Sequence, residues 1–163
     1  MVKIAIIGAG FMGQTHAAAY GEIENAKLTA ICDRSQEGRE AFAEKFGCPA
    51  FADFETMLAG AEFDVVDICL PTFLHEEYVG LAARAKKDIF CEKPFTLSVA
   101  SLDRMFETVR ENQVGQEKEG IDTMLVNGGL FIKNGGKYVT IFKYNKRTQD
   151  LIFNENLSLK SLF

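Results

Sequence analysis

The sequence predicts an α/β fold: a doubly wound parallel sheet with helices on both faces, followed by a short β-rich tail. Three observations indicate this class. Short apolar runs alternate with helical segments over about two-thirds of the chain, which is typical of βαβ units. A glycine pattern, G-x-G-x-x-G, occupies residues 8–13, between the first apolar run and the first helical segment. An aspartate, Asp33, ends the second apolar run, twenty residues after Gly13.

The chain opens with a strand and a helix. Ile4 to Ile7 is a short apolar run that ends at a glycine, which indicates a buried parallel strand. Phe11 to Tyr20 is rich in alanine, the residue with the highest helix propensity, and predicts a helix.

Three glycines join this strand to this helix, and each has a distinct expected role. Gly8 permits the tight turn, Gly10 lets a pyrophosphate approach the backbone, and Gly13 lets the helix pack close to the strand. The N–H groups of the first helical turn, together with the helix dipole, then face the phosphates. A glycine-rich turn without a ligand is the alternative interpretation. The candidate cofactor-binding residues of this segment are Gly8, Gly10, Phe11, Met12 and Gly13.

The following segments continue the alternation. Further strands are predicted over Lys27 to Cys32, Pro49 to Phe51, Asp64 to Leu70 and Lys87 to Cys91. Further helices are predicted over Ser35 to Phe46, Phe54 to Ala59, Leu74 to Ala85 and Ser98 to Arg110. Local chemistry sets several of these ends, since Ser35 is a favourable N-cap, Gly47 ends a helix and Pro71 ends a strand.

Asp33 makes the glycine pattern more specific. A carboxylate after the second strand can accept hydrogen bonds from the ribose hydroxyls of adenosine, and it repels a 2′-phosphate. Together with the glycines this predicts a Rossmann-like dinucleotide-binding domain that takes NAD. Arg34 could instead pair with a phosphate or stack on adenine, so NADP stays open. A residue that only starts the next helix is the alternative role for Asp33.

Composition excludes several classes of function. The formal net charge of −5 argues against a nucleic-acid partner. No apolar run approaches the ~20 residues of a membrane helix, and the N-terminus does not resemble a signal peptide, so we expect a cytoplasmic protein. The four cysteines form no C-x-x-C pair, and we expect buried thiols and no metal site.

Two further clusters follow the fourth and fifth predicted strands: Pro71-Thr72-Phe73-Leu74-His75 and Glu92-Lys93-Pro94. With Gly-Ala-Gly-Phe-Met-Gly, they resemble the N-terminal domain of the Gfo/Idh/MocA family, the glucose–fructose oxidoreductase and inositol dehydrogenase type. The resemblance covers about Met1 to Val114. It implies an NAD(P)-dependent oxidoreductase that acts on a sugar, a cyclitol or a related polyol.

The resemblance also implies roles for single residues. Lys93 matches the family's catalytic and substrate-binding lysine, and an ammonium beside the substrate hydroxyl can assist proton transfer. Glu92 would help to place that lysine and the nicotinamide ribose, while Pro71, Thr72 and His75 would lie near the cofactor. A solvated surface lysine is the alternative for Lys93, and a helix-start histidine with its hydrogen bonds satisfied is the alternative for His75.

The composition changes near Val114. There are 11 basic and 18 acidic residues up to that point and 7 and 5 after it, and residues 115–163 contain no alanine. We therefore expect a dinucleotide-binding domain over 1–120 and a tail over 121–163, with strands at Thr123 to Val126, Lys137 to Tyr144 and Leu151 to Phe153.

This tail is too short for the family's second domain, which holds most of the substrate pocket and further catalytic residues. We hypothesise a truncated or altered family member that forms a homo-oligomer. The alternatives are a non-catalytic dinucleotide-binding module, used for redox sensing or with a partner chain, and a truncated inactive homologue. A methyltransferase is disfavoured because it gives Glu92, Lys93 and Pro94 no role.

Overall fold

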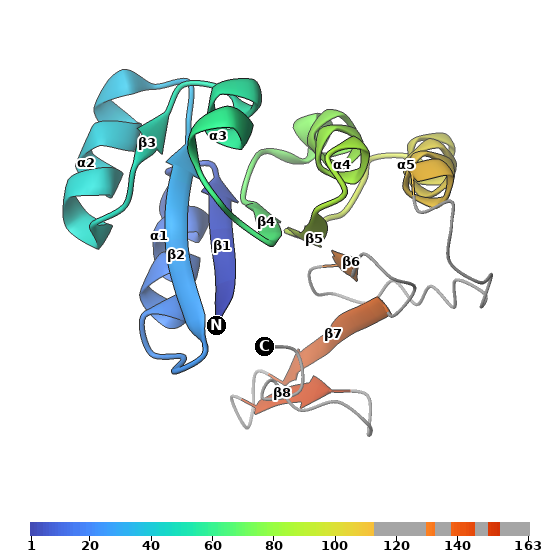
Figure 1. Ribbon diagram of the computed structural model, residues 1–163. Helices are drawn as coiled ribbons and strands as arrows, with labels where there is room; N and C mark the ends of the chain where they lie inside the picture. The colour runs from blue at the N-terminus through green and yellow to red at the C-terminus, as the bar shows by residue number, and fades with distance from the viewer. Residues whose placement is uncertain (113–129, 133–137, 146–149, 154–163) are drawn as a thin grey trace. The chain divides into compact units, whose positions relative to one another are not determined.

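The computed structural model describes residues 1–112, 130–132, 138–145 and 150–153, and the side chains of 1–112 (Figure 1). The chain divides into two compact units, Met1–Leu70 and Pro71–Phe163. The predicted domain boundary at residue 120 and the predicted strand Thr123 to Val126 lie outside the described residues.

The first unit contains a parallel sheet. Its strands are β1 (Val2–Ile7), β2 (Ala26–Cys32), β3 (Ala50–Phe51) and β4 (Val65–Ile68), in the order β3-β2-β1-β4 (Figure 1). The chain first adds strands on one side of β1 and then returns to its other side, where β4 pairs with it. Such a reversal is a topological switch point, and ligands of open α/β sheets bind beyond the carboxyl ends of the strands there.

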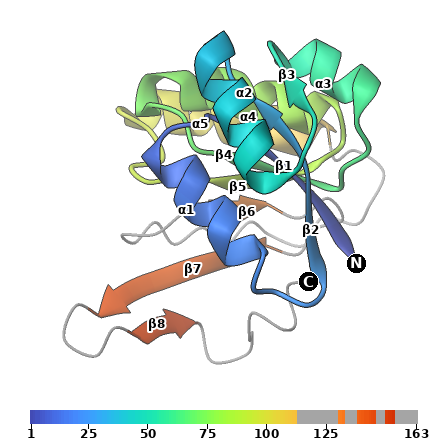
Figure 2. The same ribbon diagram turned by 90° about the vertical axis from the view of Figure 1, so that its left-hand side faces the viewer.

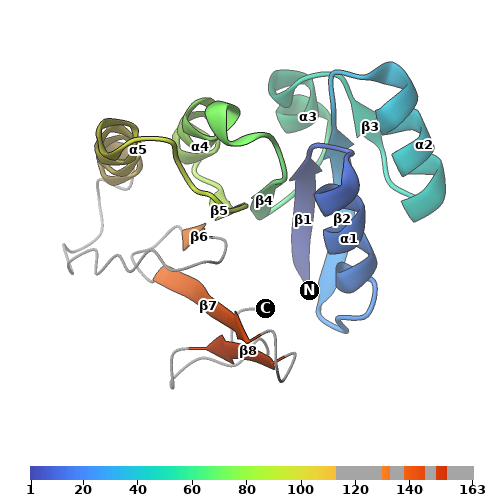
Figure 3. The ribbon, with the colours of Figure 1, turned by 180° about the vertical axis from the view of Figure 1, so that it is seen from behind.

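Three helices flank this sheet: α1 (Phe11–Tyr20), α2 (Gln36–Phe46) and α3 (Phe54–Gly60). Figures 1 and 3, which look at opposite sides, show α1 on one face of the sheet and α3 on the other. The predicted ends of α2 are confirmed, because the Ser35 hydroxyl accepts a hydrogen bond from the Gly38 N–H (3.2 Å) and Gly47 ends the helix at φ +69°.

The apolar sequences predict buried strands, and residues 4–7 of β1, residues 30–32 of β2 and all of β4 are buried. Ile4, Ile6, Ile31 and Ile68 are each fully buried, and burying such a side chain contributes about 1.5–3 kcal/mol. One polar side chain interrupts this core: Asp67, on β4, is 0% exposed.

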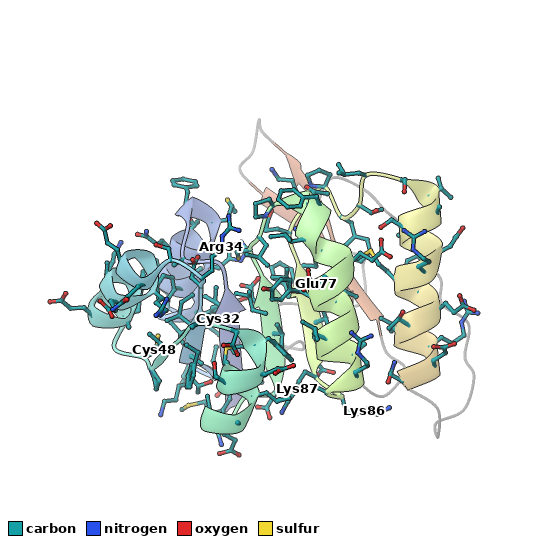
Figure 4. All side chains as sticks on the ribbon, turned by 90° about the horizontal axis from the view of Figure 1, so that it is seen from above. Cys32, Arg34, Cys48, Glu77, Lys86 and Lys87 are labelled. Atoms are coloured by element: carbon teal, nitrogen blue, oxygen red, sulfur yellow. The ribbon has the colours of Figure 1, made fainter. Side chains whose placement is uncertain are left out.

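The second unit begins with a 3-10 turn, η1 (Thr72–Leu74), followed by α4 (His75–Arg84), β5 (Asp88–Cys91) and α5 (Val99–Asn112). Helices α4 and α5 lie side by side, and Figure 4 shows Glu77 on α4 and Lys86 just beyond its end. The Glu76 carboxylate joins the two helices by accepting hydrogen bonds from the Arg104 guanidinium (2.6 and 2.9 Å) and the Ser101 hydroxyl (2.6 Å).

Further strands belong to the second unit: β6 (Leu130–Ile132), β7 (Tyr138–Asn145) and β8 (Asp150–Phe153). Strand β6 pairs antiparallel with β5 and with β7, and β7 pairs antiparallel with β8 (Figure 2). The fold of the tail as a whole stays a prediction, because the segments that connect these strands lie outside the described residues. Over the part of the chain that the structure describes, every helix is too short or too polar to span a membrane.

Candidate functional site

The turn between β1 and α1 requires glycine at two of its three glycine positions. Gly8 has φ +106°, and a Cβ there would lie 2.7 Å from the carbonyl oxygen of Cys69. A Cβ on Gly13 would lie 1.9 Å from the carbonyl oxygen of Gly8. The turn can therefore approach the end of β4, and α1 can approach the turn, only because both residues lack a side chain. The structural roles predicted for Gly8 and Gly13 are confirmed.

Gly10 differs from both. Its backbone, at φ −70° and ψ −167°, suits any residue, and a Cβ built on it meets nothing within 4 Å. The fold itself therefore gives no reason for glycine at this position. The open space lies at the N-terminus of α1, where Gly10 is the N-cap and the first turn contains no acidic residue. The first N–H groups of a helix have no partner within it, so they can bind an anion.

Asp33 fastens this turn to the start of α2. Its Oδ2 accepts a hydrogen bond from the Ala9 N–H (2.7 Å), and its Oδ1 accepts one from the Ser35 N–H (2.8 Å). Each carboxylate oxygen has two lone pairs, so the group can still accept ribose hydroxyls. The helix-start role and the ribose role, which the sequence presented as alternatives, are thus compatible.

The two arginines near Asp33 differ in their surroundings. Arg34 is exposed just beyond the carboxyl end of β2, whose last residue is Cys32 (Figure 4). The Arg39 guanidinium donates to the backbone carbonyl oxygens of Asp33 and Arg34, both at 3.3 Å. Arg39 therefore supports the loop, whereas Arg34 points its charge to solvent, where a phosphate could reach it.

In the second unit, His75 ties two predicted site segments together. It begins α4, is 1% exposed, and its Nδ1 lies 3.0 Å from the carbonyl oxygen of Phe95. Pro71 is exposed and Thr72 half-buried, and the Leu74 N–H donates to the Pro71 carbonyl oxygen to close the 3-10 turn. His75 thus has the satisfied, helix-start environment that the sequence allowed as one of its two interpretations.

The Glu92-Lys93-Pro94 turn follows β5. The Glu92 side chain is half-buried and its Oε2 accepts a hydrogen bond from the Lys93 N–H (3.1 Å). The Lys93 side chain is exposed, and Phe95, two residues on, is buried. Because Glu92 and Phe95 are held in place, the lysine between them is presented to solvent from an anchored backbone.

Sequence reasoning missed one cluster. Asp67 Oδ2 lies 2.8 Å from His16 Nδ1 and accepts a hydrogen bond from the Tyr20 hydroxyl at 2.8 Å. The Cys69 thiol lies 3.3 Å from His16 Nδ1 and 3.4 Å from Asp67 Oδ1. The spacing of these residues in the sequence was the one signal that could have indicated the cluster. Positions 16 and 20 lie on one face of a helix, and positions 67 and 69 lie on one face of an extended strand.

No disulfide joins the four cysteines, all of which the structure describes. Cys32, Cys48 and Cys91 are buried, as predicted, whereas Cys69 is partly exposed. Burial raises the pKa of the Cys32 and Cys69 thiols to about 12 and that of Cys48 to about 11, so all three are protonated at neutral pH.

Comparison with known proteins identifies the family. The model of an oxidoreductase family with an NAD-binding Rossmann fold matches residues 2–116. The chain belongs to the Gfo/Idh/MocA family. This confirms the family and the Rossmann-like fold class inferred from the sequence.

Three relatives illustrate the family. The chain is 36% identical over 114 residues to myo-inositol 2-dehydrogenase of Thermotoga maritima, covering 69% of this chain and 34% of that protein. It is 34% identical over 115 residues to the NADP⁺ scyllo-inositol 2-dehydrogenase of Bacillus subtilis, covering 70% and 35%. A crystal structure of an Agrobacterium radiobacter oxidoreductase with NAD⁺, L-tartaric acid and magnesium has a TM-score of 0.66 and 30% identity, covering 69% and 33%. The chain thus spans about a third of the length of the relatives it matches.

Proposed function

We propose that this chain supplies the cofactor-binding half of an NAD(P)-dependent oxidoreductase. The enzyme would move a hydride between the nicotinamide and a hydroxyl-bearing carbon of a sugar, cyclitol or related polyol. Membership of an NAD-binding oxidoreductase family supports the reaction type, and the inositol dehydrogenases among the relatives support the substrate class.

The observation behind this proposal is the contrast among the three glycines. Two of them are required by the fold, whereas Gly10 occupies a backbone conformation that alanine would accept, beside open space. A group that approaches the backbone from outside explains a glycine there. The space adjoins the α1 N-terminus, so an anion such as a pyrophosphate suits it.

The proposal assigns the predicted residues to parts of the cofactor. The glycine turn and the first turn of α1 would hold the pyrophosphate, Asp33 the adenosine ribose, and Arg34 the adenine or a 2′-phosphate. Pro71, Thr72 and Glu92 would contact the nicotinamide half, and His75, which is 1% exposed, would hold the adjoining turn in place through the Phe95 carbonyl oxygen. The proposed cofactor-binding set is therefore Gly8, Gly10, Phe11, Met12, Gly13, Asp33, Arg34, Pro71, Thr72, Glu92 and Lys93, with His75 as a positioning residue.

Lys93 is the proposed catalytic residue. The dinucleotide, once bound, supplies the hydride acceptor or donor at its nicotinamide ring. In the oxidising direction the exposed Lys93 side chain, as the neutral amine, would accept the proton of the substrate hydroxyl as the hydride leaves carbon. In the reducing direction its ammonium would return that proton to the carbonyl oxygen. Glu92, whose carboxylate accepts the Lys93 N–H, would fix the backbone from which this lysine extends.

We expect NAD to bind more tightly than NADP. The Asp33 carboxylate is held by two backbone N–H groups at 2.7 and 2.8 Å, so it cannot turn away from an incoming 2′-phosphate without losing them. Its negative charge would then repel that phosphate. The exposed Arg34 would attract the same phosphate, which reduces the expected difference between the NAD and NADP affinities.

Calorimetric titration with NAD⁺, NADH and NADP⁺ tests the binding step. The wild-type chain should bind, and Gly10→Ala should weaken binding at least about tenfold, or about 1.4 kcal/mol, while its thermal melting stays unchanged. Ala18→Ser, on the exposed face of the same helix, is the matched control and should bind as the wild type does. Absence of binding at millimolar dinucleotide would overturn the proposal.

Turnover is tested separately, by steady-state oxidation of a panel of cyclitols and sugars with NAD⁺. Activity that Lys93→Ala abolishes, with dinucleotide affinity retained within a few-fold, would support the catalytic role. Dinucleotide binding without turnover on any substrate would instead favour a binding module that acts with a partner chain.

The proposal extends to assembly and location. We expect a homo-oligomer that acts in the cytoplasm and, at a net charge of −5, has no nucleic-acid partner. Sedimentation equilibrium tests the assembly, and a monomer at micromolar concentration would contradict it.

A further inference from the structure

We propose that His16, Asp67 and Cys69 bind a divalent transition-metal ion of the zinc type. The three side chains converge within the first unit, His16 from α1 and the other two from β4 and the residue that follows it. One potential ligand atom from each residue, Nδ1, a carboxylate oxygen and Sγ, lies within 4.8 Å of the other two.

The spacing of these atoms suits tetrahedral coordination. With zinc–ligand bonds of about 2.0–2.3 Å, neighbouring ligand atoms are separated by about 3.4–3.6 Å. Cys69 Sγ already lies 3.3 Å from His16 Nδ1 and 3.4 Å from Asp67 Oδ1. The His16 Nδ1 to Asp67 Oδ2 distance of 2.8 Å must widen by roughly half an ångström, which a rotation of the imidazole can provide.

The donor set selects the class of ion. One thiolate, one imidazole and one carboxylate suit zinc and its neighbours in the first transition row, whereas calcium and magnesium prefer all-oxygen sites. Three protein ligands leave a fourth tetrahedral position for water.

The surroundings of the three side chains suit metal coordination. Asp67 is fully buried on β4, among apolar neighbours, so its oxygens are held by hydrogen bonds rather than solvated. The Tyr20 hydroxyl donates to Asp67 Oδ2 at 2.8 Å, which is the outer contact that orients a ligating carboxylate. His16 retains 15% side-chain exposure and Cys69 is partly exposed, so an ion can enter from solvent.

Binding has a defined proton balance. The Cys69 S–H bond breaks, a sulfur–metal bond forms, and the thiol proton passes to the buffer. His16 coordinates as a neutral imidazole, so its ring proton moves to Nε2 when Nδ1 becomes a ligand, with no net loss. Each bound ion should therefore release at least one proton, that of the Cys69 thiol.

Cobalt(II) is the probe for the test, because its spectrum reports both coordination geometry and thiolate ligation. The full chain, prepared with chelator and then dialysed free of it, should bind one equivalent of Co²⁺ and develop tetrahedral visible bands and a thiolate-to-cobalt charge-transfer band. Zn²⁺ should displace the cobalt and bleach these bands. Every histidine and cysteine of the sequence lies within residues 1–112, so the thiolate signal must come from one of four known cysteines.

Variants locate the site. Cys69→Ser should remove the charge-transfer band, and His16→Gln should weaken Co²⁺ binding and shift the visible bands. Tyr20→Phe should weaken binding about 10–100-fold without removing the band. Cys48→Ser, which alters another buried thiol, is the matched control and should keep the full spectrum.

Several results would overturn the proposal: no Co²⁺ binding by the folded wild-type chain, a charge-transfer band that persists in Cys69→Ser, or binding without proton release. If Cys69→Ser fails to fold by circular dichroism, His16→Gln and the proton count decide. None of these readouts requires dinucleotide binding or turnover, so the metal site and the proposed function fail independently.

Discussion

The turn after β1 and the turn after β5 are held by different kinds of interaction. In the first, the constraint is in the backbone: Gly8 adopts φ +106° and Gly13 leaves no space for a Cβ. In the second, side chains provide the anchors, since His75 lies 3.0 Å from the Phe95 carbonyl oxygen and Glu92 accepts the Lys93 N–H.

The difference explains why one site was easier to infer. Only glycine satisfies the geometry of the first turn, so the residue type itself reveals the structure. Glutamate, lysine and histidine occur in many settings, so the second cluster became informative only through its resemblance to a family. Substitutions in the first turn should therefore disturb the backbone itself, whereas substitutions in the second should remove side-chain contacts.

Gly13→Ala should unfold the first turn. The added methyl would sit 1.9 Å from the Gly8 carbonyl oxygen, a backbone atom that cannot move away alone, so we expect a loss of about 3 kcal/mol or more in the free energy of unfolding. Urea denaturation followed by circular dichroism measures it. Gly10→Ala is the matched control, expected within about 0.5 kcal/mol of wild type. Equal stability of the two variants would contradict the backbone account.

His75→Ala tests the side-chain anchor of the second unit. It removes a buried ring and leaves the Phe95 carbonyl without that contact, so we expect a loss of about 2 kcal/mol. The same denaturation assay applies. Phe73→Ala, two residues earlier and 70% exposed, should change stability little. A wild-type melting curve for His75→Ala would mean that this contact does not hold the turn.

Asp33→Ala tests a position at which both kinds of interaction act, because the Asp33 side chain holds the backbone of the turn after β1. NAD⁺ affinity should fall about tenfold, and the ratio of NADP⁺ to NAD⁺ affinity should rise as the repulsive charge disappears. Asp64→Ala is a close control, since Asp64 Oδ2 accepts the Lys3 N–H at 2.8 Å near the amino end of β4. If both variants lowered affinity alike, the effect would be one of stability alone.

The smallest effect concerns the pairing of α4 with α5. The hydrogen bond from Arg104, then that from Ser101, lowers the pKa of Glu76 from 4.5 to about 2. A carboxylate with a depressed pKa in the folded state stabilises the protein above its unfolded pKa, and this contribution disappears as the pH falls from about 4.5 towards 2. Glu76→Gln should flatten stability over that range in acid-titration melts. Glu77→Gln, the exposed neighbour, should leave the pH dependence as in wild type.

Local chemistry allowed much of the fold to be predicted. Ser35 and Gly47 mark the ends of α2 because a cap and a left-handed glycine act within a few residues. The start of α4 was placed one residue early, at Leu74, because the chain first makes a 3-10 turn. The cluster of His16 and Asp67 was missed because 51 positions separate residues that only the folded sheet brings together.

The candidate site shows the same difference between local signals, which the sequence reveals, and contacts between distant residues, which it does not. The roles of Gly8 and Gly13 came from backbone physics, whereas the bond between Asp33 and the Ala9 N–H spans 24 positions and has no local signal. The roles of Lys93 and its neighbours rest on the family pattern and stay predictions, because no sequence rule distinguishes a catalytic lysine from a surface one.

The double attachment of Asp33 has a consequence for protein engineering. Redesign of this chain for NADP would start by replacing that carboxylate, yet the same carboxylate fastens the Ala9 N–H at 2.7 Å and the Ser35 N–H at 2.8 Å. A neutral replacement that relieves the proposed repulsion of a 2′-phosphate also loosens the turn between β1 and α1. A single substitution at Asp33 would therefore change both the expected cofactor preference and the anchoring of the loop. A change of preference to NADP that keeps the loop in place will need a second substitution that restores an acceptor for the Ala9 N–H.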